Sequence, residues 1–329
     1  MLKKIQTNKA LFLETLFFIA LIFCAGFISI KEGFSACVLD GVKLFVACVF
    51  PSLFPYLFIT AILSNLRVTA KFSFRLNNLT SKIFAVGGSV SYALFLSLIA
   101  GYPVGAKTVS DLKLNGVIDQ NESVRASVLC SSSSPVFLIS SVGGIMAGDT
   151  LFGLKLFLLH VLTVLLVGFI FSFYKRKTPL TPKNVQVPLS QSTNVLYDGA
   201  YSAVISTLVV GALITLFFVL TKILSTTGVL TPFFKLFSLP FGSSGGQGLT
   251  LGIFECTQGL KVILSAERTF FTMPLCAFIT GFGGLSVIAQ SLAFLKKAKI
   301  KTAPFVLSKL TSAVLSFIFA VILNLIFGV

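Results

Sequence analysis

The chain has 329 residues, of which 55% are apolar and only 11% are charged. A soluble domain carries about 25% charged residues, so the composition excludes a soluble globular enzyme, a disordered chain and a disulfide scaffold. The net charge of +16 comes from basic residues that lie mostly between apolar stretches, as in the loops of membrane proteins. The sequence therefore indicates an all-α, polytopic transmembrane helical bundle that contacts the lipid bilayer and needs no nucleic acid as a partner.

The first apolar run, residues 10–30, follows Lys3, Lys4 and Lys9. About 20 apolar residues is a spanning length and exceeds the apolar core of a typical signal peptide. We expect an uncleaved N-terminal transmembrane helix within residues 1–35, with its N-terminus in the cytoplasm.

Further apolar runs of spanning length follow along the chain. They lie at about 36–64, 126–147, 151–174, 199–224, 270–294 and 303–327. Two other segments, at about 84–110 and 247–266, are apolar but are interrupted by Gly and other residues that disfavour a continuous helix. Whether these two segments cross the bilayer once or turn back decides the topology of everything after them.

The positive-inside rule predicts that both interrupted segments turn back. If 84–110 crossed once, the basic cluster at 175–183 would lie outside, and the same holds for 247–266 and the cluster at 296–301. As re-entrant hairpins they keep all four basic clusters, at residues 3–9, 67–82, 175–183 and 296–301, in the cytoplasm, together with Lys107, Lys113 and Arg125. We therefore predict about seven spans plus two hairpins, with the N-terminus inside and the C-terminus outside. Non-helical backbone at membrane depth is tolerated only where it is buried in protein or lines a water-filled cavity. Two hairpins therefore predict a buried polar site.

After the first helix, the chain divides into two halves with the same pattern. Residues 36–174 and residues 199–329 each read as span, hairpin, span, span, and the polar segment 175–198 joins them as a cytoplasmic linker. The first span of one half starts outside and that of the other starts inside. This is an inverted repeat, as in secondary transporters whose sites lie at the repeat interface.

Two motifs of the first half could carry chemistry. In AGYPVGAK (100–107), Gly and Pro interrupt the helix and free backbone groups that can hold a ligand; the alternative is a tight turn with a snorkelling Lys107. In the second motif, four serines precede Pro135, which we expect to break the helix. Their hydroxyls can bind a cation or polar substrate, or can pack and bond to their own backbone.

Two motifs of the second half complete the set. GIFECTQG (252–259) places Glu255 in a short apolar segment, where an ionisable residue is a functional candidate that could bind substrate, a proton or a cation. Alternatively, Glu255 pairs with Lys107 or Lys261, or lies in water at a hairpin tip. GFGGLSVIAQ (281–290) permits either close helix packing or an unwound point.

These motifs supply the candidate substrate-binding residues. They are Gly101, Tyr102, Pro103, Gly105, Lys107, Ser131, Ser132, Ser133, Ser134, Glu255, Thr257, Gly283, Gly284, Ser286 and Gln290. We expect His160 to be an internal hydrogen-bonding side chain and Asp149 a short-loop residue. The six cysteines lack metal-ligand spacing, so we expect buried free thiols and no metal site. No catalytic set or cofactor is expected, apart from a coupling Na⁺ or H⁺.

The four motifs, in this order and spacing, resemble those of the sporulation integral membrane proteins of the YlbJ type, which carry the nucleoside-recognition (Gate) domain. The resemblance covers nearly the whole chain, and His160 falls where that family tends to have His. Two features depart from the family: Ser132 stands where Asn is expected, and the linker between the halves is shorter.

The resemblance implies a permease-like multipass protein of an endospore former, in the cell membrane or the membrane around the forespore. It also implies a distant similarity to concentrative nucleoside transporters, which have two re-entrant hairpins and broken helices. Members of the family are associated with moving dipicolinic acid. The implied function is alternating-access transport of a small polar or anionic metabolite, dipicolinate-like or nucleoside-like, with Lys107 attracting the anion and Glu255 coupling a cation or proton.

A second hypothesis comes from a different class of protein. On the same Gate scaffold, the chain could act as a non-transporting assembly or signalling subunit of sporulation. A membrane enzyme is not expected, because the sequence has no Ser/His/Asp set, no metal cluster and no phosphate-binding loop. Self-association into a homo-oligomer and the identity of the small-molecule substrate stay open at this point.

Overall fold

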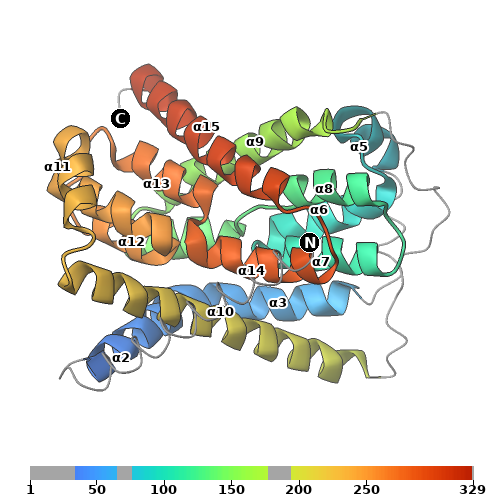
Figure 1. Cartoon of the computed structure of the whole chain (residues 1–329), viewed down its shortest axis with the longest axis horizontal. Helices are drawn as coiled ribbons and strands as arrows, with labels where there is room; N and C mark the ends of the chain where they lie inside the picture. The colour runs from blue at the N-terminus through green and yellow to red at the C-terminus, as the bar shows by residue number, and fades with distance from the viewer. Residues whose placement is uncertain (1–33, 65–75, 177–193, 328–329) are drawn as a thin grey trace, which may run out of the picture.

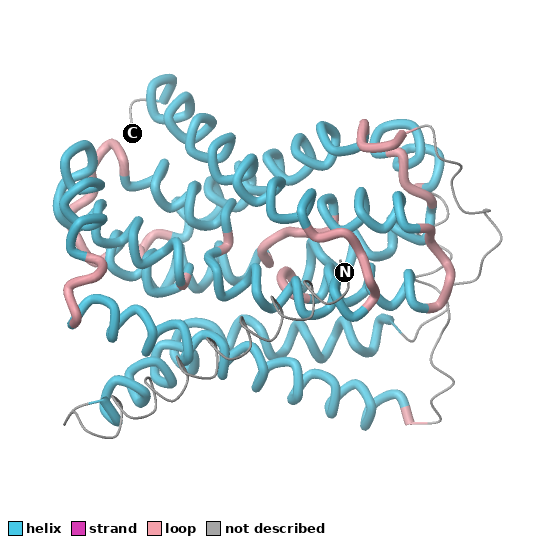
Figure 2. The backbone as a smooth tube through the Cα atoms, in the orientation of Figure 1, coloured by secondary structure: helices cyan, strands magenta, loops and turns pink. Residues whose placement is uncertain are grey.

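The structure is a computed structural model that describes residues 34–64, 76–176 and 194–327. The predicted first helix and most of the predicted linker lie outside these residues. The described part is helical and contains no strand, which confirms the predicted fold class. Figure 2 shows that loop segments interrupt the helices inside the body of the molecule as well as at its ends.

The first half contains seven α-helices and two π-helices in its described residues. They are α2 (Phe34–Leu44), η1 (Phe45–Val49), α3 (Phe50–Ser64), α5 (Asn77–Phe84), α6 (Gly88–Ala100), α7 (Val104–Leu114), α8 (Gln120–Leu129), η2 (Phe137–Met146) and α9 (Thr150–Ser172). The second half is entirely α-helical where it is described. It comprises α10 (Val195–Thr226), α11 (Thr231–Phe254), α12 (Cys256–Leu264), α13 (Thr272–Phe282), α14 (Gly284–Lys297) and α15 (Ala303–Phe327).

The long helices flank a central group of shorter ones. Helix α10 packs along α2 and α3, whereas α15 packs against α9 and α13. Figure 1 shows α2, α3 and α10 along the lower side and α9 and α15 along the upper side, with α7, α8, α12, α13 and α14 between them. The interrupted segments predicted from Gly and Pro therefore occupy the middle of the bundle.

Four helices are long and apolar enough to cross a membrane, and two bent helix pairs raise this number to six. One bent pair joins Ser35–Val49 to Leu53–Ile59, and the other joins α5 to α6 at 89°. The predicted span 126–147 is divided between α8 and η2, and the predicted span 270–294 is divided between α13 and α14. The polytopic architecture is confirmed, while the count of seven spans plus two hairpins stays a prediction.

Both interrupted segments fold as pairs of packed helices. In the first, α6 packs against α7 across a break at residues 101–103; in the second, α11 packs against α12 across a break at Glu255. Helix α11 is itself kinked at Gly242, which has φ 72°. Each half thus has a long helix or bent pair, a helix pair, a divided helix and a final long helix. The inverted relation between residues 36–174 and 199–329 stays a prediction.

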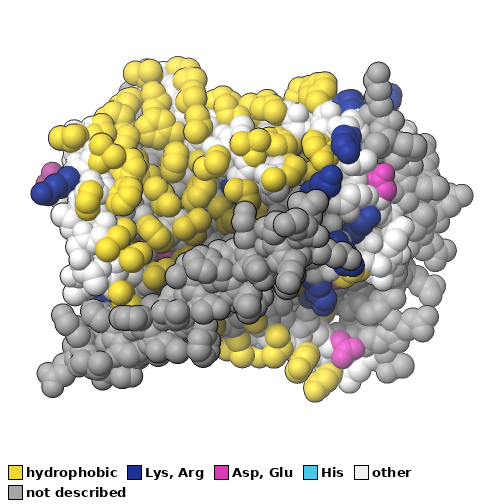
Figure 3. Space-filling view, viewed as in Figure 1, with side chains coloured by type: hydrophobic (Ala, Val, Ile, Leu, Met, Phe, Trp, Pro, Cys, Tyr) yellow, Lys and Arg dark blue, Asp and Glu magenta, His cyan; other side chains and the backbone are white. Residues whose placement is uncertain are grey.

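Parts of three predicted basic clusters meet at one end of the bundle. Arg176 donates hydrogen bonds to the carbonyl oxygens of Lys82 and Ile83, and Gln120 donates to that of Lys299 at 3.2 Å. Figure 3 shows Lys and Arg side chains gathered near one end of the visible face, beside a broad hydrophobic surface. A one-sided distribution of this kind is the pattern that the positive-inside rule describes.

Arg125 has a structural role that its sequence context does not show. The sequence assigns it to the cytoplasmic charges, but the side chain is only 2% exposed. It donates to the carbonyl oxygens of Ala85 at 2.8 Å and of Tyr174 and Lys175 at 3.0 Å. These carbonyls lie just beyond the C-terminal ends of α5 and α9, where helices leave acceptors unsatisfied and a positive charge is favourable. Arg125 therefore ties α8 to two helix ends.

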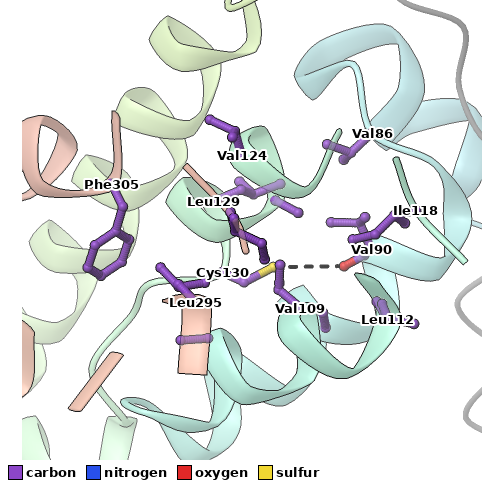
Figure 4. Packing of buried hydrophobic residues seen from close by; sticks show 14 of the residues in the cluster. Val86, Val90, Val109, Leu112, Ile118, Val124, Leu129, Cys130, Leu295 and Phe305 are labelled. Carbon is purple, nitrogen blue, oxygen red and sulfur yellow. Dashed lines mark hydrogen bonds between the residues drawn. The ribbon is translucent and has the colours of Figure 1, made fainter. Parts of the chain in front are cut away.

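The largest buried apolar cluster surrounds the end of α8. Its members come from α5, α6, α7, α8, α13, α14 and α15, together with loop residues. Figure 4 shows part of the cluster, with Cys130 Sγ 4.0 Å from the carbonyl oxygen of Val90. The five described cysteines are all free and buried, which confirms the prediction for them; Cys24 lies outside the described residues.

An ion pair joins the two halves at the other end of the bundle. Arg268, between α12 and α13, lies 2.9 Å from the carboxylate of Asp149, which precedes α9. Asp149 also accepts a hydrogen bond from the Phe152 backbone at 3.0 Å as the N-cap of α9. The hydrogen bond from Arg268 and that from Phe152 hold the pKa of Asp149 below its usual value. Asp149 is thus a short-loop residue, as predicted, with a capping role.

Candidate functional site

The tip of the first hairpin packs directly on the serine segment. Gly101 has φ 74°, and a Cβ there would lie 2.5 Å from the backbone nitrogen of Ser134. A Cβ on Gly105 would lie 1.9 Å from the carbonyl oxygen of Cys130. Both separations are far below van der Waals contact, so only glycine allows this approach. These two glycines of the first motif shape the site through backbone contact.

The second half repeats this arrangement. Gly283, between α13 and α14, and Gly284, the first residue of α14, have φ of 83° and 77°. A Cβ on Gly284 would lie 3.0 Å from the backbone nitrogen of Cys256 and 3.1 Å from the carbonyl oxygen of Gly252. The break in the divided helix therefore packs against the tip of the second hairpin. Of the two readings of the fourth motif, the structure shows both close packing and an interrupted helix.

The four serines form a buried, non-helical segment between α8 and η2. Helix α8 ends at Leu129, and helical structure resumes at Pro135. The Ser134 hydroxyl accepts a hydrogen bond from the Phe137 backbone at 3.2 Å, and the Ser133 backbone donates to His160 Nε2 at 2.9 Å. The predicted span 126–147 is thus interrupted directly before Pro135, as expected, and Pro135 begins the second helical stretch, where its missing N–H costs nothing. His160 is an internal hydrogen-bonding residue, as predicted.

Glu255 is the residue that separates α11 from α12. It has extended backbone, with φ −138° and ψ 112°, and its side chain is the N-cap of α12, accepting a hydrogen bond from the Gln258 backbone at 2.6 Å. The residue is only 1% exposed. A carboxylate at a helix N-terminus is stabilised by the unsatisfied N–H groups and the helix dipole. This local arrangement explains how an acid is held inside an apolar segment.

The lysines that could have paired with Glu255 lie elsewhere. Lys107 Nζ donates to Ser202 Oγ of α10 at 3.3 Å, and Lys261 is exposed. No ion pair joins Glu255 to a lysine among the described residues. The Glu255 carboxylate thus remains available to a ligand on any side that α12 does not occupy.

A pocket lies where the breaks of both halves meet. Seven of the predicted binding residues line it: Tyr102, Ser133, Ser134, Glu255, Thr257, Gly283 and Gln290. The rest of its lining is mainly apolar and comes from η1, α3, α10 and neighbouring helices: Val49, Leu53, Ala100, Phe137, Val210, Ile214, Cys256, Thr280 and Val287. A mostly apolar wall with a few convergent polar groups is typical of a small-molecule site.

The remaining predicted residues lie outside the pocket lining. They are Gly101, Pro103, Gly105, Lys107, Ser131, Ser132, Gly284 and Ser286. The glycines of this set allow the close backbone contacts between the hairpin tips and the divided helices. Ser286 accepts a hydrogen bond from the lining residue Gln290 at 3.3 Å. Lys107 donates to Ser202 of α10 and does not line the pocket, so the pocket lacks the lysine predicted from the sequence to bind an anion.

Sequence reasoning missed Lys309. This residue of α15 is only 2% exposed, and its Nζ donates to the carbonyl oxygen of Ser131 at 3.3 Å. The ammonium also lies 4.1 Å from the centre of the Tyr102 ring, within the range of a cation–π interaction. A usable signal was present, because Lys309 is a single charge within the apolar run 303–327 and an intramembrane charge is a functional candidate by default.

Tyr102, at the tip of the first hairpin, contacts α13 of the second half and α9 of its own half. Its hydroxyl donates to the carbonyl oxygen of Thr280 in α13 at 3.3 Å, and its ring packs edge-on to His160 at 6.4 Å. Among the described residues, no group of three or more His, Cys, Asp or Glu side chains could hold a metal ion. The polar part of the pocket lining offers hydroxyl, amide, carboxylate and backbone groups, which can bind an organic solute.

Comparison with known proteins supports the resemblance seen in the motifs. The chain is 28% identical over 310 residues to the sporulation integral membrane protein YlbJ of Bacillus subtilis (strain 168), a match that covers 86% of this chain and 76% of that protein. Neither a protein-family profile nor a solved structure matches the chain. The chain is thus similar to a sporulation integral membrane protein, and its long apolar helices support a multipass location in a membrane.

Proposed function

We propose that the protein is a secondary transporter of a small polar or anionic metabolite, dipicolinate-like or nucleoside-like, which works by alternating access during sporulation. The observation that carries this proposal is the pocket lined by breaks of both halves. Helices that are interrupted at the centre of a bundle are the usual binding sites of secondary transporters. The sporulation setting rests on the similarity to YlbJ.

The pocket suggests how access could alternate. Its wall combines the tips of two hairpins with α10 and the η1–α3 segment. Tyr102 and Thr280 connect the halves by one hydrogen bond of 3.3 Å, which is long for an O–H donor and is easily exchanged for water. Movement of one half against the other would open the pocket first to one face and then to the other. Glu255 would carry the coupling Na⁺ or H⁺.

Transport by the reconstituted protein tests the proposal. We expect proteoliposomes containing the parent protein to accumulate labelled dipicolinate or a labelled nucleoside above the level of protein-free liposomes, and an imposed Na⁺ or H⁺ gradient to increase the rate. Counterflow, in which unlabelled solute inside accelerates entry of the label, separates a carrier from a leak. The proposal is contradicted if uptake of both solute classes equals the protein-free level while a thermal-unfolding measurement shows that the protein is folded.

The alternative is a non-transporting assembly or signalling subunit of sporulation. It would use the same scaffold to contact protein partners. Deletion of the gene should cause a sporulation defect. If a variant with all four motifs altered fully repairs that defect, the result favours this alternative. The buried pocket favours the transporter, because a docking surface needs no polar cluster inside the bundle.

A further inference from the structure

A group of hydrogen-bond donors lies buried behind Tyr102. It consists of Lys309 of α15, Ser131 of the serine segment and His160 of α9, which are 2%, 7% and 1% exposed. Lys309 Nζ contacts the Ser131 carbonyl at 3.3 Å, and His160 Nε2 is bound by the Ser133 backbone at 2.9 Å. The serine segment and α9 of the first half and the last helix of the second half thus meet at one cluster.

This cluster has more donors than acceptors. The Ser131 hydroxyl and His160 Nδ1 have no hydrogen-bond partner among the described residues. Because His160 Nε2 accepts a hydrogen bond, a neutral imidazole carries its proton on Nδ1, which makes that atom a donor. The ammonium of Lys309 has three N–H groups and donates to one carbonyl oxygen. Several buried N–H and O–H groups therefore lack an acceptor.

When Lys309 is protonated, the cluster carries a positive charge without a counter-ion. Lys309 forms no ion pair with a described Asp or Glu. A buried ammonium is costly unless a charge or several hydrogen bonds compensate it, and the Tyr102 ring at 4.1 Å provides only part of that compensation. Surplus donors and an unpaired positive charge together are complementary to a carboxylate, which accepts several hydrogen bonds and carries one negative charge.

Tyr102 separates this cluster from the pocket. Its ring lies against the Lys309 ammonium, and the same residue lines the pocket that Glu255 and Gln290 also line. Ser133 likewise lines the pocket while its backbone binds His160. The cluster is therefore the region directly behind one wall of the pocket.

We propose that Lys309, Ser131 and His160 form a carboxylate subsite at the inner end of the pocket, which Tyr102 covers in this structure and uncovers when an anionic ligand binds. The ligand carboxylate replaces the Tyr102 ring as the partner of the ammonium and accepts hydrogen bonds from the Ser131 hydroxyl and His160 Nδ1–H. The rest of the ligand occupies the pocket. This inference rests on the proposed function only in taking the pocket as the solute site.

Equilibrium binding to the purified full-length protein in detergent tests the subsite without transport. The probes are benzoate and pyridine-2,6-dicarboxylate, each compared with its uncharged amide. We expect the parent to bind the carboxylates more tightly than the amides, by about tenfold or more for one charge-assisted hydrogen-bond set. Lys309→Gln should abolish this preference, and the exposed-lysine control Lys222→Gln should retain it.

A second variant separates binding from folding. Ser131→Ala removes a hydroxyl that has no partner in the ligand-free protein, so its thermal unfolding should match that of the parent while its carboxylate preference falls several-fold. If Lys309→Gln does not fold, the Ser131→Ala result decides. An unchanged preference in either folded variant, or equal binding of acid and amide by the parent, overturns the subsite. If the protein takes up no solute but still prefers carboxylates in a Lys309-dependent way, the subsite proposal stands and the transporter proposal is rejected.

Discussion

Glu255→Gln will strongly reduce solute uptake while leaving the protein folded. Glutamine has nearly the same shape and can still accept the hydrogen bond from the Gln258 backbone, which caps α12 at 2.6 Å in the parent. It cannot hold a negative charge, so it cannot carry a proton and binds a cation weakly. Hydrogen bonds to a charged group contribute about 1.5–3 kcal/mol, so we expect the uptake rate to fall roughly ten- to hundredfold.

The measurement is initial uptake into proteoliposomes at matched protein density, with thermal unfolding of the same preparations. Glu267→Gln is the matched control, because Glu267 is an exposed acid of the same half. Uptake by the Glu255→Gln protein at the parental rate, with the same response to a Na⁺ or H⁺ gradient, would show that Glu255 only caps its helix. A loss of thermal stability that accounts for all lost uptake would point to the same conclusion.

Gly105→Ala will destabilise the fold more than any other single alanine substitution in the four motifs. The added Cβ would lie 1.9 Å from the Cys130 carbonyl oxygen and 2.7 Å from Ser97 Oγ. The first of these neighbours is backbone, so no side-chain rotation relieves the clash, and α7 must move away from the serine segment. Overpacking of this kind costs about 3 kcal/mol, the upper end of its usual range.

Thermal unfolding in detergent and the yield of monodisperse protein will measure this effect. Gly144→Ala is the control, because the nearest atom to a Cβ there is 3.9 Å away. We expect the control to unfold near the parental temperature and Gly105→Ala to unfold well below it or to aggregate. If both substitutions unfold at the parental temperature, the close packing of the first hairpin on the serine segment is wrong.

Local sequence chemistry predicted the interruptions of the helices well. Gly101, Gly283 and Gly284 adopt backbone angles that L-residues with side chains rarely tolerate, and their positions in apolar stretches identify the breaks without a structure. Glu255 lies at a break for a related reason, since a carboxylate that caps a helix must precede it. The convergence of four such motifs on one pocket follows from their positions in the two halves.

Residues whose roles depend on distant partners could not be assigned. Lys107 and Lys309 both occur in largely apolar surroundings, but only tertiary packing places Lys309 beside the serine segment and Lys107 against α10. In the sequence, Arg125 similarly looks like one of the cytoplasmic basic residues that set the orientation in the membrane. Only the fold brings the ends of α5 and α9 within hydrogen-bonding distance of it. Pro135 can either break or begin a helix, and the capping hydroxyl of Ser134 decides between these roles.

The reactivity of Cys256 tests the central claim, a solute pocket that opens to each membrane face, most directly. Cys256 lines the pocket, whereas Cys276 is fully buried and does not. In chains that retain only one of these cysteines, a membrane-impermeant thiol reagent is applied to spheroplasts and to inverted vesicles. We predict that Cys256 reacts from both faces, that dipicolinate or nucleoside slows the reaction, and that Cys276 stays unmodified. Reaction of Cys256 from one face only, or at a rate that neither solute changes, would contradict alternating access at this pocket.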